Sequence, residues 1–76
     1  MNWQEHIIVD KNICHGQACL IGTRIPVSVV LDNLAAGIST QEILTSYPSL
    51  TSDGIKAVLS YAAYLARERV IALSEA

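Results

Sequence analysis

The sequence lacks long apolar runs and any familiar catalytic arrangement. No apolar run approaches the ~20 residues that cross a membrane, and residues 1–5 lack the basic start and apolar core of a signal peptide. We therefore expect a cytoplasmic protein with no membrane span. A phosphate-binding glycine loop, paired catalytic carboxylates and a Ser-His-Asp arrangement are also missing. We expect neither an enzyme nor a bound cofactor.

An excess of basic residues is missing as well. Five Lys and Arg residues stand against seven Asp and Glu residues, which leaves a net charge of -2 and a pI near 5.5. A domain that grips DNA on its own usually has a basic patch and a high pI. Strong, sequence-independent binding of phosphates by a monomer is therefore not expected. Weak binding that dimerisation or a partner reinforces remains open.

Apolar residues, in contrast, are abundant at 51% of the chain, while charged residues make up only 16%. A chain of 76 residues has a thin core, because a domain of this size buries only about 60% of its unfolded surface. More apolar surface is present than one small core hides, so we predict a homo-oligomer, with a two-fold dimer as the expected form. Cys14 and Cys19 are expected to be free thiols in a reducing compartment.

Three helical segments with short connections are predicted over residues 26–73. Pro26 and Gly37 suit the first position of one helix and the position just past its end. Ser39 and Glu42 form a capping box that begins a second helix. The third is much longer than the roughly 11-residue average helix. This order of helices and turns matches a helix-turn-helix unit.

Before the helices, residues 6–25 are predicted to form a β element. Residues 6–10 contain a short β-branched run and residues 18–21 are apolar, so the two segments suit two pairing strands. Gly22 supplies a backbone angle that other residues avoid. We therefore predict one domain over residues 1–76, of the α+β class and mainly α. A short N-terminal β hairpin precedes a three-helix helix-turn-helix unit with a long third helix.

The third predicted helix, from about Ser52 to Leu73 with Thr51 as its cap, is apolar on two sides. The side expected to face the core holds Ile55, Val58, Leu59, Ala62, Ala66 and Leu73. The opposite side holds Ala57, Tyr61, Tyr64 and Ile71. Either the β element covers this second side, or its two tyrosines and Ile71 meet a second subunit or another protein, because tyrosine is favoured in such contacts.

In a DNA complex, the start of the third helix would enter the major groove. The residues that this geometry indicates are Thr51, Ser52, Lys56 and, from the preceding turn, Ser49. Arg67 shares a helix edge with Lys56 and is a candidate for the DNA backbone. In the alternative interpretation, Asp53 simply favours the positive helix N-terminus and Lys56 is solvated.

Arg24 has two interpretations. Its side chain either reaches a phosphate, a base edge or an acidic partner, or it forks onto a carboxylate such as Asp32 or Glu42 and ties the hairpin to the helices.

A metal site is a further hypothesis, because Cys14, His15 and Cys19 are residue types that bind zinc and His6 is near them in the sequence. The two cysteines are separated by four residues, at the edge of the spacing that zinc sites use. Free cysteine in an apolar stretch is most often part of the core. We therefore expect no metal.

Residues 14–27, Cys-His-Gly-Gln-Ala-Cys-Leu-Ile-Gly-Thr-Arg-Ile-Pro-Val, carry a family resemblance. They resemble the signature of the bacterial family known as domain of unknown function four-three-three, whose members resemble VapB-type antitoxins. The similarity runs from Ile7 to about Ile71, and residues 22–26 are its most specific part. It implies a homeodomain-like helix-turn-helix with an N-terminal hairpin, and often a neighbouring gene for a PIN-like ribonuclease toxin.

Together, these observations lead us to expect a DNA-binding antitoxin or autorepressor of a toxin-antitoxin type module, which contacts operator DNA weakly and with the help of a partner. The alternative is a protein-interaction module of the same three-helix fold that does not bind DNA. The order of the helices and the resemblance favour the first. The acidic charge balance favours the second.

Overall fold

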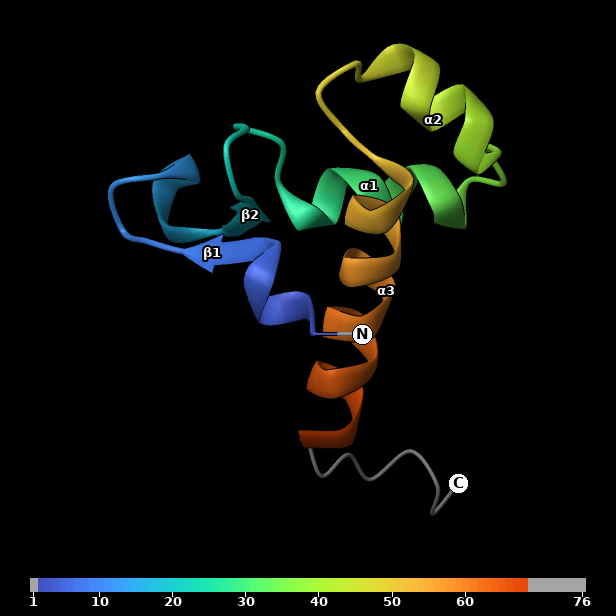
Figure 1. Ribbon diagram of the computed structural model, residues 1–76. Coiled ribbons are helices and arrows are strands. Elements are labelled where there is room, and N and C mark those ends of the chain that lie inside the picture. Colours follow the sequence, from blue (N-terminus) through green and yellow to red (C-terminus); the bar gives the residue numbers. More distant parts are fainter. Residues whose placement is uncertain (1, 69–76) are drawn as a thin grey trace.

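The computed structural model describes residues 2–68 and places a two-stranded sheet beside three helices (Figure 1). Two one-turn 3-10 helices, η1 and η2, flank the first strand. The elements in chain order are η1 (Trp3–Glu5), β1 (Ile7–Val9), η2 (Cys14–Gly16), β2 (Ala18–Leu20), α1 (Val27–Ala35), α2 (Thr40–Ser46) and α3 (Ser52–Glu68). The predicted fold class, mainly α with an N-terminal hairpin, is confirmed. Ile71 and the predicted end of the third helix lie outside the described residues.

The hairpin joins β1 and β2 in antiparallel register, with Ile7 opposite Leu20 and Ile8 opposite Cys19. Neighbouring residues of a strand point to opposite faces, so Ile7 and Leu20 share the face that is buried in the core. Cys19 points to the other face, yet it is fully buried, because the loop after β2 folds back and forms a bridge between Cys19 and Pro26. None of the described helices is long and apolar enough to span a lipid bilayer.

Local capping explains where α2 and α3 begin. The backbone N–H of Glu42 donates to Ser39 Oγ at 3.2 Å, and the N–H of Gly54 donates to Thr51 Oγ1 at 3.0 Å. These bonds satisfy amides that have no partner within the first helical turn. Both predicted caps are therefore confirmed.

The two ends of α1 agree with the sequence prediction only in part. Gly37 follows the helix with a φ of +85°, the left-handed conformation that commonly ends a helix. Pro26, however, is not the first helical residue. Its ψ of 144° is extended, and the residue caps the helix that begins at Val27. The bridge to Cys19 holds Pro26 against β2, which delays the start of the helix by one residue.

The core lies where the hairpin, α1, α2 and the first half of α3 meet (Figure 1). Its buried apolar residues are Ile7, Leu20, Val27, Val30, Ile43, Leu50, Ile55, Ala57 and Val58. Beyond this core, α3 continues away from the other helices, and η1 lies beside it. The C-terminal half of α3 therefore contacts little of the fold except the N-terminal segment.

The buried face of α3 differs from the predicted one. Ala57, which the sequence pattern placed on the opposite side, is fully buried, whereas Leu59, which was placed in the core, is 49% exposed. Ala66 is exposed as well. Because α3 is apolar on two sides, its periodicity does not define the centre of the buried stripe. The packing of Tyr61 against Trp3 of η1 turns the stripe away from Leu59.

Candidate functional site

The turn between α2 and α3 presents the residues that the sequence indicated for DNA. The N–H of Tyr47 donates to the Ile43 carbonyl at 2.9 Å, and the N–H of Leu50 donates to the Tyr47 carbonyl at 2.9 Å. The Leu50 side chain is buried and anchors the turn in the core. Ser49, Thr51 and Ser52, the residues around this anchor, are exposed. The structure thus brings these three predicted residues together at one end of α3.

Lys56 and Arg67 extend this surface along α3. Both side chains are exposed. The two residues are eleven positions apart on the helix, so their side chains leave the helix axis in directions that differ by about 20°, and they lie about 16 Å apart along the axis. Arg67 lies in a shallow hollow with Trp3 and Tyr64. Asp53 is exposed in the first turn, where its carboxylate complements the helix dipole but opposes a phosphate. The edge therefore carries two positive charges and one nearby negative charge.

Arg24 is not part of that edge. A tight loop holds its backbone: Gly22 has a φ of +79°, Thr23 Oγ1 donates to the Leu20 carbonyl at 2.8 Å, and it accepts from the Ile25 N–H at 3.1 Å. The loop places Arg24 in a polar hollow of about 380 Å³, which we call the basic hollow. The residues that line it are Lys11, Asn12, Cys14, His15, Gln17, Arg24 and Pro26.

The predicted carboxylate partners of Arg24 are not found there. Neither Asp32 nor Glu42 lines the basic hollow, and none of the described residues that line it is Asp or Glu. Thr23, the neighbour of Arg24, lines a different hollow with Ser49, Thr51 and Glu5. The loop that carries Arg24 therefore runs beside the start of α3, while Arg24 itself lines the basic hollow and not the hollow of Ser49 and Thr51.

The wall of the basic hollow contains a backbone feature that sequence reasoning missed. Cys14, His15 and Gly16 have φ values of +51°, +56° and +81°, a left-handed turn that residues with a Cβ seldom adopt. The N–H of Gly16 donates to the Ile13 carbonyl and the N–H of Gln17 to the Cys14 carbonyl, both at 3.0 Å. Gly16 signals a bend in the sequence, but nothing in the pattern signals the conformation of its two neighbours.

Cys14 and Cys19 are both free thiols, as predicted, and differ in environment. Burial raises the pKa of the Cys19 thiol, the adjacent Cys14 thiol raises it further, and the positive charge of Arg24 lowers it in part. The Cys19 thiol also points toward the Thr23 carbonyl, at 4.0 Å. Within residues 2–68, no three His, Cys, Asp or Glu side chains are grouped so that they could hold a metal ion.

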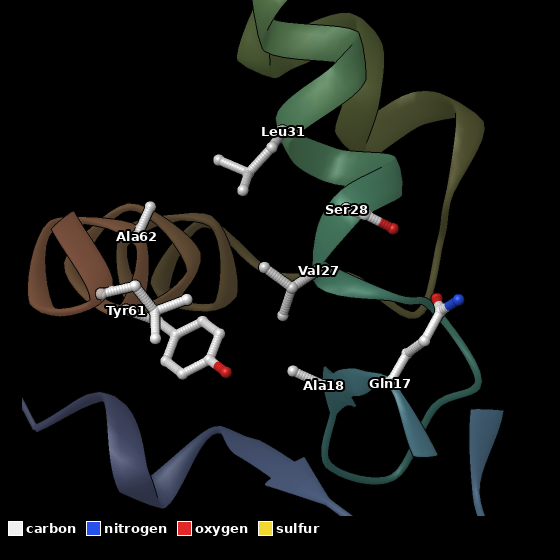
Figure 2. A pocket seen from close by; sticks show the side chains of 8 residues that line it. Gln17, Ala18, Val27, Ser28, Leu31, Tyr61 and Ala62 are labelled. Atoms are coloured by element: carbon white, nitrogen blue, oxygen red, sulfur yellow. The ribbon is translucent and has the colours of Figure 1, made fainter. Parts of the chain in front are cut away.

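An apolar groove of about 470 Å³ opens between α1, α3 and β2. Figure 2 shows Tyr61 and Ala62 of α3 on one side of it and Val27 and Leu31 of α1 on the other. Leu65, seven residues after the buried Val58, also lines it and is 39% exposed. The groove thus lies along α3 where α1 and β2 flank the helix without closing over it.

The second side of α3 is covered in part by η1, which neither sequence interpretation included. The ring centroid of Trp3 lies 4.7 Å from that of Tyr61 and 5.3 Å from that of Tyr64. Tyr61 is partly buried by this contact and packs against the core. Tyr64 remains 40% exposed, so part of the predicted contact surface is free on the single chain.

Comparisons with known proteins agree on one family. The family model described as "Protein of unknown function (DUF433)" matches residues 7–62, from the hairpin into α3. A crystal structure of a DUF433 member protein from Anabaena variabilis ATCC 29413 is 31% identical to this chain, with a TM-score of 0.78. The match covers 86% of this chain, which spans 64% of the length of that protein. No curated protein is significantly similar in sequence.

Proposed function

The chain belongs to the DUF433 family of proteins of unknown function, and from its site we propose that it is a DNA-binding antitoxin or autorepressor of a toxin-antitoxin type module. The observation that carries this proposal is the exposed start of α3. A tight turn with a buried anchor, Leu50, presents Ser49, Thr51 and Ser52 at the beginning of a 17-residue helix. In helix-turn-helix proteins, the residues at this position of the second helix contact base edges in the major groove.

The charges support weak rather than strong binding by each chain. Lys56 and Arg67 provide two cations along one edge of α3, while Asp53 and the net charge of -2 act against phosphate contact. Two chains related by a two-fold axis would engage two half-sites together, so the binding of one half-site would assist the other. We therefore propose that the operator is bound by a homodimer in the cytoplasm.

A second candidate function is a protein-interaction module that does not bind DNA. The specific observation in its favour is the apolar groove, which Leu65 lines, together with the exposed Tyr64 in the neighbouring hollow with Trp3. Exposed apolar surface of this kind marks contact sites on small domains. We propose a PIN-like ribonuclease toxin as the partner of the antitoxin, as the family resemblance implies. The two candidates differ only in whether the start of α3 contacts DNA.

DNA binding by variants of Lys56 tests the proposal. We expect Lys56→Ala to weaken binding to DNA from upstream of the gene and to reduce the salt slope by about one phosphate contact. Lys56→Arg keeps the charge and should keep the slope. Gln41→Glu on the exposed surface of α2 changes the net charge by the same amount and should bind as the unaltered chain does. Equal binding by Lys56→Ala and the unaltered chain would exclude Lys56 from the interface.

A further inference from the structure

We propose that the basic hollow is a binding site for a phosphate group, held by the side chains of Lys11 and Arg24 with His15 beside them. The hollow contains none of the residues at the start of α3, and the proposal does not depend on DNA binding. It takes a tetrahedral oxyanion, whether free in solution, on a nucleotide or in a nucleic-acid backbone.

The distribution of charge is the first argument. The chain has an acidic balance and only five Lys and Arg residues, yet two of these five and one of its two histidines line a single hollow. None of the described residues in the lining is acidic, and the carboxylate of Asp10, which precedes Lys11, accepts from the Asn12 N–H. Positive groups that share a hollow repel one another unless an anion lies between them. An oxyanion is therefore the ligand that best complements this arrangement.

The chemistry of the side chains is the second argument. The planar guanidinium of Arg24 presents paired N–H donors that match two phosphate oxygens, while Lys11 contributes a mobile point charge. The side-chain amides of Asn12 and Gln17, on the same wall, provide further N–H donors. A volume of about 380 Å³ accommodates a phosphate group together with the sugar of a nucleotide.

The rigidity of the two walls is the third argument. On one wall, hydrogen bonds of the Thr23 hydroxyl and the left-handed Gly22 hold the loop that carries Arg24. On the other wall, Asp10 Oδ1 accepts from the Asn12 N–H at 2.8 Å, and the left-handed turn holds His15. Backbone in sparsely populated conformations occurs often at ligand sites. The side chains are exposed, while these hydrogen bonds fix the backbone that carries them.

Titration of the full chain with sodium phosphate, followed by NMR, tests the proposal. A titration with sodium chloride at matched ionic strength is the control. We expect saturable shifts of the Lys11, His15 and Arg24 signals with phosphate only. Arg24→Gln and Lys11→Gln should each raise the dissociation constant about tenfold or more, as expected for the loss of a charged hydrogen bond. Gln41→Glu has the same change in net charge and should leave the dissociation constant unchanged.

A competition experiment distinguishes the sources of the phosphate. If a scrambled DNA duplex displaces phosphate, and the duplex no longer shifts the signals of the hollow in Arg24→Gln, a nucleic-acid backbone is the ligand. Phosphate binding that the duplex does not displace would identify a free phosphate or a nucleotide. Shifts that never saturate, or an equal loss of binding in Gln41→Glu, would overturn the proposal, since general charge attraction would then explain the result.

Discussion

At the scale of single residues, some side chains bond to partners within one helical turn, whereas others share a hollow with residues from distant segments. The hydroxyls of Ser39 and Thr51 were predictable as caps, because a cap needs only residues within the next turn. Arg24 was not predictable in the same way. Its neighbours, Lys11 and His15, lie on the opposite side of β2 in the sequence, and only the folded hairpin brings them together.

The Thr51 cap should contribute measurably to stability. Thr51→Ala removes the acceptor of the Gly54 N–H, and we expect the free energy of unfolding to fall by about 1 kcal/mol. Urea denaturation measures this change. Thr45→Ala is the matched control, because the Thr45 hydroxyl bonds only to the Gln41 carbonyl within α2 and is exposed. Similar effects of the two variants would show that the cap is not what stabilises the start of α3.

The buried Cys19 thiol should make stability depend on pH in the alkaline range. Its pKa is raised by burial, so near pH 9.0, the ordinary thiol value, the unfolded chain loses a proton that the folded chain keeps. Stability is therefore lost as the pH rises above this value, since the unfolded state then binds fewer protons. Cys19→Ala lacks this contribution. Denaturation at pH 8 and pH 10 should show a steeper loss for the unaltered chain, and parallel losses would contradict the assignment.

At the scale of elements, the existence of the hairpin and the three helices could be predicted, whereas their mutual orientation could not. Start and stop signals are local, so Ser39, Gly37 and Thr51 indicate boundaries without reference to the rest of the chain. The buried side of α3 depends on which segments pack against it. The contact with Trp3 forms across more than fifty residues, and no periodicity within α3 indicates it.

The contact between η1 and α3 should stabilise the second half of that helix. Trp3→Ala removes the ring that packs on Tyr61 and Tyr64, and we expect a loss of about 1–2 kcal/mol from lost aromatic contact and apolar burial. Trp3→Phe should recover most of it. Thermal unfolding measures the loss of stability, and hydrogen exchange of the α3 amides measures the support that η1 gives to the helix. Unchanged exchange after residue 60 in Trp3→Ala would show that η1 does not support the helix.

At the scale of the whole molecule, the prediction from composition was that one chain has more apolar surface than it buries. Among the described residues, large apolar side chains are exposed on the hairpin, at Val9 and Ile21, and along α3, at Leu59, Tyr64 and Leu65. Leu65, at 39% exposure, also lines the apolar groove. The surplus could be predicted from the 51% apolar content, but its position could not, because it depends on where α3 leaves the core.

The oligomer should depend on this surface. We expect a dimer by light scattering at micromolar concentration, and we expect Tyr64→Ser combined with Leu65→Ser to shift it to the monomer, because both changes remove apolar contact area. Leu59→Ser is the control, since Leu59 is 49% exposed and lies on another side of α3. A monomer in the unaltered chain would contradict the dimer proposal. Dissociation by Leu59→Ser alone would place the interface elsewhere.

Fluorescence anisotropy tests most directly whether the start of α3 recognises DNA. The full chain is titrated onto labelled DNA from upstream of its own gene and onto scrambled DNA, at two salt concentrations, alone and with the product of the neighbouring gene. We expect preferential binding to the upstream DNA that weakens with salt. Equal or absent binding to the two DNAs in all these conditions would contradict the claim and support the interaction module.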